Sequence, residues 1–293
     1  MIPVFRTLEK VLDSDTTVLI EGESGTGKDA LAHWLHSNSS RKHGPFIKLD
    51  LGSLPEDLVE SELFGYERGA FTGAQEAKLG KFDIAQGGTI VIDEIANVDM
   101  RVQAKLLNVV EAKQFFRLGG THSVTLDARI VALSGEPLAR AVERKTFRQD
   151  LFFRLNLINV RVPPLRERRS ELLIIATRLL AQLDRKYGGA TELMAECHPI
   201  LLNYDFPGNV RELRNGLERA LLMSTDRRIT PGVLPPNWLV TRSAGKMPSL
   251  EDIEREYIAE VLSQTRGKKT KAAEVLGISR KTLLEKRKKY GLG

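Results

Sequence analysis

The sequence predicts an α/β domain built on a parallel sheet with helices on both faces, followed by two all-helical units. Three observations support this fold class. Short runs rich in β-branched residues alternate with helical patterns as far as Pro163–Pro164. A glycine-rich segment, Gly22–Lys28, separates one such run from a helical pattern. From Ser170 to Met223 the pattern is helical throughout, with Ala, Leu and Arg dominant.

The first part of the chain is expected to hold five strands. Their ranges are Thr17–Glu21, Phe46–Asp50, Thr89–Asp93, Ala128–Leu133 and Leu157–Val162. Helical spacing lies between them, at Gly27–Ser37 and Val102–Glu111. Strands separated by helices favour parallel pairing, because the crossover needs a dozen or more residues.

Shifts in composition predict the domain boundaries in this chain of 293 residues. The α/β core is expected over residues 1–168 and a helical subdomain over 169–239, which Pro231, Pro235 and Pro236 bring to an end. Residues 240–249 have the composition of a linker, and a small helical domain is expected over 250–293.

Composition excludes several classes of protein. Hydrophobic residues make up 42% and charged residues 28%, which is ordinary for a globular chain. No apolar run reaches the roughly 18 residues of a membrane span, and no signal peptide precedes the core. The single cysteine, Cys197, excludes an internal disulfide and a cysteine-based zinc site. We therefore expect a cytoplasmic location and no membrane partner.

Positive charge is concentrated at the end of the chain. Residues 266–293 hold ten Lys/Arg against two acids, whereas the whole chain carries a net charge of +6. A basic tail on a near-neutral body is typical of a nucleic-acid module, although a solvated charge run is the simpler alternative.

The segment Gly22-Glu-Ser-Gly-Thr-Gly-Lys28 fits the phosphate-binding pattern G-x-x-x-x-G-K. Backbone N–H groups of such a loop turn toward phosphate oxygens, and the following helix N-terminus favours negative charge. The expected nucleotide-binding residues are Gly22, Glu23, Ser24, Gly25, Thr26, Gly27, Lys28 and Asp29. Asp29 stands where Ser or Thr would give a hydroxyl to Mg²⁺, and a carboxylate there can hold the metal through water.

A second motif, Ile90-Val-Ile-Asp93-Glu94, ends an apolar strand in two acids. Asp93 is the expected Mg²⁺ carboxylate, and Glu94 is the expected base that orients the attacking water. An acid pair after a strand is often only a helix cap, so its weight comes from the glycine-rich loop beside it.

The chain resembles the sigma-54-dependent transcriptional activators, which are bacterial enhancer-binding proteins with an AAA+ ATPase domain. The resemblance is strongest at Gly69-Ala-Phe-Thr-Gly-Ala74, the GAFTGA hexapeptide. Further matching motifs are Gly22–Lys28, Gly87–Glu94, Phe147–Leu155, Pro163–Arg168 and Phe206–Leu213. This resemblance implies an AAA+ P-loop NTPase with a helical lid and a Fis-type helix-turn-helix. It also implies ATP and Mg²⁺ as cofactors.

The resemblance also implies roles for individual residues. The sigma-54 contact loop is Gly69, Ala70, Phe71, Thr72, Gly73 and Ala74, with a buried Phe71 as the alternative. Arg148 and Arg154 match arginine fingers that reach a neighbouring subunit, which implies a ring, usually a hexamer. Arg211 matches the sensor arginine of the lid. The partners would be sigma-54 RNA polymerase holoenzyme and double-stranded enhancer DNA.

Two positions depart from the family pattern. Asp50 replaces an Asn that restrains the catalytic glutamate, and an acid there would repel Glu94 or share a proton with it. Ser134-Gly135 aligns with the first sensor, where Ser134 can substitute for the usual side chain. No sensor or receiver domain is expected ahead of residue 1 in this sequence. Three alternatives follow: control by a trans-acting regulator, control through the protein's own synthesis, or a gene form that has lost the module.

The end of the chain has the sequence pattern of a helix-turn-helix: a helical pattern, Gly277 at the turn, then a second helix capped by Ser279. Ser279, Arg280, Lys281, Thr282 and Glu285 are expected near base edges. Lys268, Lys269, Lys271, Lys286, Lys288 and Lys289 are expected at phosphates. The small core would hold Ala272, Ala273, Leu276, Ile278, Leu283 and Leu284, with dimerisation through Leu250–Gln264.

Three functions compete. The first is an ATP-driven activator that binds upstream DNA and remodels sigma-54 RNA polymerase from the closed to the open promoter complex. The second is an ATP-binding, hydrolysis-impaired DNA-binding regulator, which Asp50 and Gly135 motivate. The third is another AAA+ machine such as a helicase loader, against which the GAFTGA hexapeptide argues.

Overall fold

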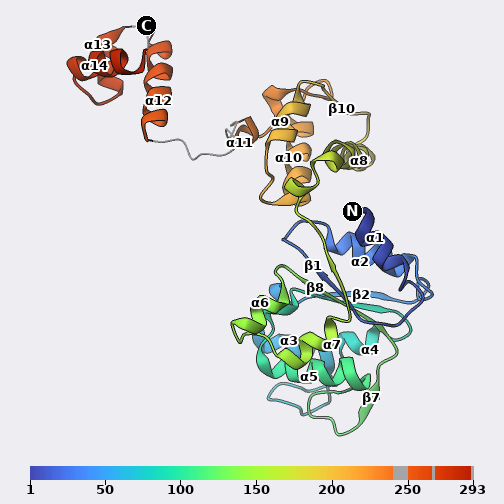
Figure 1. Ribbon diagram of the computed structural model, residues 1–293. Helices are drawn as coiled ribbons and strands as arrows, with labels where there is room; N and C mark the ends of the chain where they lie inside the picture. The colour runs from blue at the N-terminus through green and yellow to red at the C-terminus, as the bar shows by residue number, and fades with distance from the viewer. Residues whose placement is uncertain (240–249, 266–267, 292–293) are drawn as a thin grey trace. The chain divides into compact units, whose positions relative to one another are not determined.

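The computed structural model describes residues 1–239, 250–265 and 268–291 (Figure 1). The expected linker, residues 240–249, lies outside the described residues. The chain divides into two compact units, Met1–Thr241 and Arg242–Gly293, which are described separately.

A five-stranded parallel sheet of order β2-β5-β8-β1-β9 forms the centre of the first unit. Its strands are β1 (Val18–Glu21), β2 (Phe46–Asp50), β5 (Thr89–Asp93), β8 (Arg129–Ser134) and β9 (Ile158–Arg161). The five predicted strands and their parallel pairing are confirmed. The register places Asp50 opposite Asp93 and Glu21 opposite Ser134, so the polar strand ends meet at one edge.

Helices cover both faces of this sheet, because alternate residues of each buried strand point to opposite sides. Leu19, Ile90 and Ile92 pack on one face, where the helices are α3 (Glu56–Phe64), α4 (Lys81–Ile84), α5 (Met100–Ala112), α6 (Leu138–Glu143) and α7 (Gln149–Leu155). Val18 and Val91 pack on the other face, against α1 (Ile2–Glu9) and α2 (Lys28–Ser37). Figure 1 shows the two helix layers on either side of the strands.

Two short hairpins extend from the face that carries α3 to α7. One pairs β3 (Gly65–Tyr66) with β4 (Lys78–Leu79), and the other pairs β6 (Gln114–Phe116) with β7 (Ser123–Thr125). The 3₁₀ turns are η1 (Leu51–Ser53), η2 (Ile95–Asn97), η3 (Leu165–Glu167) and η4 (Pro231–Val233). Strands of two or three residues show no periodicity, and the sequence did not predict them.

The helical part of the first unit has its own core. Its helices are α8 (Arg169–Tyr187), α9 (Cys197–Asn203), α10 (Asn209–Met223) and α11 (Pro236–Leu239). Cys197 and Trp238 are buried in this core, as expected. The prediction of helix throughout residues 170–223 was wrong at β10 (Glu192–Leu193), which pairs with β11 (Arg228–Ile229). The partner strand lies 36 residues later, beyond the reach of a local pattern.

The described residues of the second unit form α12 (Leu250–Gln264), α13 (Lys269–Val275) and α14 (Arg280–Tyr290). Ala272, Ala273 and Leu283 are buried as predicted, with Ile258 and Val261 of α12. Placing Leu284 in the core was wrong, because it is 43% exposed, one residue around the helix from Leu283. No described helix is long and apolar enough to cross a membrane.

Candidate functional site

The glycine-rich loop connects β1 to α2 and places Lys28 as the first residue of the helix. The Lys28 ammonium is buried and donates to the carbonyl oxygens of Gly22 at 2.6 Å and Glu23 at 3.2 Å. The lysine therefore folds back onto its own loop, and a phosphate would have to take the place of these carbonyls.

Acidic and basic groups surround Lys28. Burial lowers its pKa, the carboxylates of Glu94, Asp93 and Asp29 act in the opposite direction, and Arg211 adds to the lowering. The lysine, Asp93 at the end of β5, Glu94 directly after it and the lid arginine therefore lie within electrostatic reach of one another. The structure brings these sequence-predicted residues together in one place.

Glu94 follows β5 in a left-handed backbone conformation, with φ 55° and ψ 42°. This conformation is uncommon for a residue with a side chain, and in folded proteins it is often found at functional sites. Its N–H donates to the Asp93 carboxylate at 2.9 Å. A Cβ atom added at Gly135 would lie 3.2 Å from Glu94 Oε2, so the glycine leaves room for this carboxylate.

Lys48 of β2 forms ion pairs with both candidate metal ligands, Asp29 and Asp93. Its ammonium lies 2.5 Å from Asp29 Oδ1 and 2.8 Å from Asp93 Oδ2. Burial lowers the pKa of Lys48, but hydrogen bonds and charge from these two carboxylates outweigh it and the pKa is raised. Among the described residues, no cluster of three or more metal-binding side chains occurs. A pair of carboxylates nevertheless fits Mg²⁺, which is often held by one or two carboxylates with waters and substrate phosphates.

At each of the two positions that depart from the family pattern, the side chain of Asp50 or Ser134 forms a hydrogen bond with a nearby backbone group. The Asp50 carboxylate accepts from the N–H of Gly52 at 3.1 Å and so caps the η1 turn. The Ser134 hydroxyl is fully buried and donates to the carbonyl of Glu136 at 2.5 Å. The expected sensor role of Ser134 therefore requires this hydrogen bond to break.

The lid is fastened to the phosphate loop through Asn209, the first residue of α10. Its side chain is fully buried, accepts from Leu165 N at 2.8 Å, and donates to Ser24 O at 3.0 Å and Glu23 Oε2 at 3.2 Å. The carbonyl of Gly25 accepts from Val210 N at 2.9 Å. A Cβ at Gly25 would lie 2.4 Å from the carbonyl oxygen of Gly208, so only glycine allows this approach.

Charged side chains strengthen the same junction. Arg166 pairs with the Glu23 carboxylate through two contacts of 2.6 and 2.8 Å, and it is the main cause that lowers the pKa of Glu23 to about 2. Arg168 is buried and donates to Thr26 O at 2.7 Å. Arg211 donates to the Ser24 hydroxyl at 2.7 Å.

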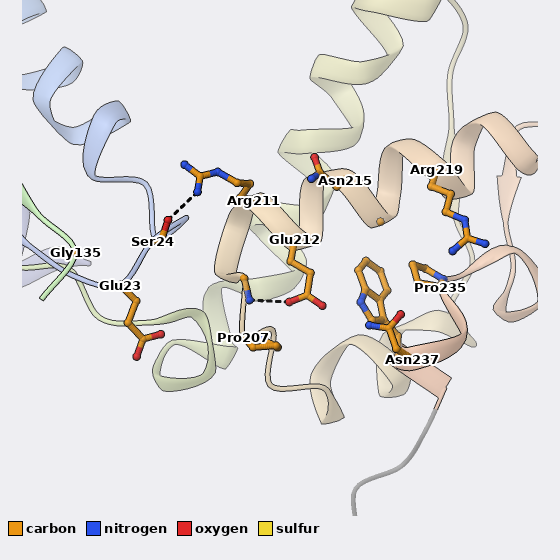
Figure 2. Close-up of a pocket in the computed structure, with 13 residues that line it drawn as sticks. Glu23, Ser24, Gly135, Pro207, Arg211, Glu212, Asn215, Arg219, Pro235 and Asn237 are labelled. Carbon is orange, nitrogen blue, oxygen red and sulfur yellow. Dashed lines mark hydrogen bonds between the residues drawn. The ribbon is translucent and has the colours of Figure 1, made fainter. Parts of the chain in front are cut away.

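A cavity of about 630 Å³ opens beside this junction. Glu23, Ser24 and Gly135 line one end, and Arg211, Glu212 and Trp238 of the lid continue it. Figure 2 shows Ser24 and Arg211 pointing toward each other, with Arg219 farther along α10 near Pro235. Lys28 and Asp93 are not among the lining residues. The cavity is large enough for a small-molecule ligand.

The two candidate arginine fingers lie elsewhere. Arg148, at the start of α7, pairs with Asp150 through contacts of 2.7 and 3.0 Å. Arg154 of the same helix pairs with Glu111 of α5 and is 61% exposed. Neither arginine lines the cavity of its own chain.

The GAFTGA segment belongs to the loop between β3 and β4, in which Phe71, Thr72 and Gly73 are exposed and Ala74 is buried. Gly69 and Gly73 have φ values of 84° and 111°, and the N–H of Gly69 donates to Ala74 O at 2.8 Å. Phe71 is 47% exposed, which excludes the alternative of a core side chain, and its ring stacks edge-on against Tyr66 at 5.0 Å. Arg117 links Glu67 beside this loop to Asp83 of α4.

The candidate DNA-binding residues belong to the second unit. The Ser279 hydroxyl caps α14 by accepting from Thr282 N at 3.1 Å, and Arg280 and Lys281 are exposed. Lys268, Lys271 and Glu285 are exposed as well. Lys286 pairs with Glu254 of α12 at 2.5 Å, so it would have to leave or share that carboxylate to reach a phosphate.

Sequence reasoning missed three residues of the site: Lys48, Asn209 and Arg166. Lys48 breaks the apolar pattern of a strand beside the acid pair, which was an available signal. Asn209 and Arg166 lie inside quoted motifs, but their partners in the glycine-rich loop are 185 and 143 residues away. Only the folded chain connects them.

Three family models match the chain in succession. They are the Sigma-54 interaction domain over residues 1–161, the AAA+ ATPase lid domain over 166–251, and the Bacterial regulatory protein, Fis family, over 249–290. The matching order agrees with the order of the α/β core, the lid and the helix-turn-helix.

Similar proteins point the same way. The chain is 39% identical to Regulatory protein AtoC of Escherichia coli (strain K12), over 100% of this chain and 66% of AtoC. It is 38% identical to Transcriptional regulatory protein FlbD of Caulobacter vibrioides, over 98% of this chain and 68% of FlbD. The crystal structure of NtrX from Brucella abortus in complex with ATP is 30% identical, with a TM-score of 0.76 over 100% of this chain and 68% of NtrX. The chain thus spans about two thirds of the length of these relatives.

Proposed function

Because this chain belongs to the family of sigma-54-dependent transcriptional activators, we propose that it binds and hydrolyses ATP to remodel sigma-54 RNA polymerase at promoters. The observation that carries the proposal is the gathering of Lys28, Asp93, Glu94 and Arg211 in one chain beside an open cavity. The ATP complex of the similar NtrX structure supports the choice of nucleotide.

In this proposal the glycine-rich loop and Lys28 bind the phosphates, and the ammonium exchanges the carbonyls of Gly22 and Glu23 for phosphate oxygens. Arg211 reaches the nucleotide from the lid, since it already donates to Ser24 at the mouth of the loop. Asp93 and Asp29 hold the divalent ion, which would neutralise charge on the phosphates when bound.

Glu94 orients the water that attacks the γ-phosphate. Its left-handed backbone supports this role, as does the position of its carboxylate beside Gly135, which follows β8 and lines the cavity. A general base needs to be within hydrogen-bond reach of the water it deprotonates. Asp50, capped onto Gly52, leaves Glu94 free for that task.

Arg148 and Arg154 would complete the site of a neighbouring subunit in a ring. Arg154 is exposed, Arg148 is partly exposed, and neither lines the cavity of its own chain, which supports action in trans. Each is paired with an acid on its own chain, Asp150 and Glu111, so assembly would exchange those partners for phosphate. A guanidinium supplied in this way stabilises charge that develops on the γ-phosphate.

The loop with Phe71 and Thr72 at its tip is the proposed contact with sigma-54. An exposed aromatic side chain between two glycines with left-handed backbone supports a role in binding another protein. The second unit would hold the complex on enhancer DNA as a dimer, with Arg280 and Lys281 near the bases.

Steady-state ATP hydrolysis as a function of protein concentration tests the proposal. For the wild type, the rate per subunit should rise with concentration, because each site needs an arginine from a neighbour. Glu94→Ala should abolish hydrolysis while leaving nucleotide binding intact. Arg154→Ala should do the same, and mixing it with Glu94→Ala should restore part of the rate, since each supplies what the other lacks.

A promoter assay with sigma-54 holoenzyme tests the coupling. ATP should give open complexes with the wild type, and Phe71→Ala should hydrolyse ATP without opening the promoter. Binding of ATP with no hydrolysis at any concentration would instead favour the second candidate, a nucleotide-controlled DNA-binding regulator, which the hydrogen-bonded Ser134 at the sensor position motivates.

A further inference from the structure

Lys48 occupies the corner where the divalent ion is proposed to bind. Its ammonium contacts Asp29 Oδ1 at 2.5 Å and Asp93 Oδ2 at 2.8 Å. Because both oxygens touch the same nitrogen, they are near enough to share one cation. The lysine comes from the edge strand β2, and its side chain is 34% exposed, so it can leave the site without disturbing the core.

We propose that Lys48 is a resident cation of the nucleotide site, which holds Asp29 and Asp93 together until the divalent ion arrives with ATP. This inference rests on the proposed ATP site and adds a residue that sets the metal requirement of that site. Two consequences are expected from Lys48. The nucleotide-free protein should bind divalent ions weakly, and the protein should bind ATP even without a divalent ion.

The first consequence follows from charge. The carboxylates of Asp29 and Asp93 together carry two negative charges, and Lys48 reduces the sum to one. A divalent cation entering the empty site must displace the ammonium or bind beside it against repulsion. Removing Lys48 leaves the two carboxylates without the cation that they share, which is an arrangement that attracts a divalent metal.

The second consequence follows from the substrate. The phosphates of ATP approach Lys28, and Asp93, Asp29 and Glu94 act on that lysine from close by. Without a divalent ion these acids repel the phosphates. Lys48 cancels part of their charge and can itself turn toward a phosphate oxygen, so ATP retains affinity in the absence of metal.

Mn²⁺ binding to the nucleotide-free full chain tests the first consequence, with the EPR signal of free Mn²⁺ as the readout. Lys48→Met should bind Mn²⁺ about tenfold or more tightly than the wild type, given partial exposure of the pair. Lys48→Arg should remain as weak as the wild type, because it keeps the charge. Adding Asp29→Asn to Lys48→Met should remove the gain and so locate the metal.

Binding of the fluorescent nucleotide mant-ATP in EDTA tests the second consequence, which is affinity for ATP in the absence of a divalent ion. The affinity of Lys48→Met should fall about tenfold below the wild type, and with saturating Mg²⁺ the two should agree within about threefold. Lys42→Met, a change at an exposed lysine outside this cluster, is the matched control and should behave as the wild type in both titrations.

Lys48→Met should raise the affinity for Mn²⁺ and lower the affinity for mant-ATP in EDTA. General damage to the fold would not change the two affinities in opposite directions. Equal Mn²⁺ affinity for the wild type and Lys48→Met would overturn the inference, as would a gain that survives Asp29→Asn. Because the Mn²⁺ titration contains no nucleotide, it decides the role of Lys48 separately. Failure of every variant to bind mant-ATP, even with Mg²⁺, would count against the ATP site itself.

Discussion

Arg211 of the lid donates from Nη1 to the hydroxyl of Ser24 in the glycine-rich loop, at 2.7 Å and across 187 residues of sequence. Both residues line the cavity, and Figure 2 draws the bond as a dashed line between them. Asn209, two residues earlier, binds the backbone of the same loop. The position of the lid is therefore fixed by polar contacts to the loop that is expected to hold phosphate.

Replacing Arg211 should weaken nucleotide binding. Arg211→Ala removes a charged donor from the cavity, and we expect the Kd of mant-ATP with Mg²⁺ to rise about tenfold, the scale of one charge-assisted hydrogen bond. Arg219→Ala is the matched control, because that arginine lines the same cavity roughly 12 Å farther along α10. An equal loss in both variants would mean that the general positive charge of α10 matters and the contact with Ser24 does not.

The stabilisation from the ion pair of Glu23 and Arg166 should depend on pH. Pairing with Arg166 lowers the pKa of Glu23 from 4.5 to about 2. The folded state therefore binds its proton less readily than the unfolded state, so the stabilisation is complete above pH 4.5 and is lost as pH falls toward 2. The pair is partly exposed, so we expect a coupling energy of at most about 1 kcal/mol at pH 7.

A double-mutant cycle with Glu23→Gln and Arg166→Met, followed by urea unfolding between pH 7 and pH 3, measures this coupling. The coupling should be constant down to about pH 5 and decline below it. A coupling energy that stays the same at pH 3 would contradict the assignment of the lowered pKa to this pair.

Gly216 should not tolerate alanine, although it lies inside α10. In an exposed helix the change would stabilise by about 0.5–1 kcal/mol. Here a Cβ would lie 2.1 Å from Cζ2 of Trp238, so we expect Gly216→Ala to destabilise the chain by about 1–3 kcal/mol. Thermal unfolding measures the change, with Asn215→Ala on the exposed side of the helix as control. Stabilisation by Gly216→Ala would show that Trp238 does not pack there.

The thiol of Cys197 should be unreactive until the lid unfolds. Burial raises its pKa to about 11, and the thiol donates to Ile229 O at 3.2 Å. DTNB at pH 8 should label native protein far more slowly than protein in urea. The raised pKa favours the folded state below about pH 9, and this contribution is lost as pH rises toward 11. The wild type should therefore lose more stability between pH 9 and pH 11 than Cys197→Ala does. Rapid labelling of the native protein by DTNB would contradict the buried position of the thiol.

Local pattern predicted the parts of this protein whose physics is local. Buried strands such as Val18–Glu21 are apolar up to their last residue, and the register then follows from packing both faces. The hairpin of β6 and β7 escaped prediction because three residues carry no period, and Leu284 was misplaced because one step around a helix separates buried from exposed.

The chemistry of the site divides in the same way. The glycine-rich loop, the acid pair of Asp93 and Glu94, and the GAFTGA segment are contiguous stretches whose spacing fixes their use, so the sequence by itself identified them and the family. The partners of Ser24, Glu23 and Asp93 come from distant segments. The tertiary structure alone brought Arg211, Arg166 and Lys48 to them, because contacts across a parallel sheet and a docked lid depend on chain packing and not on sequence spacing.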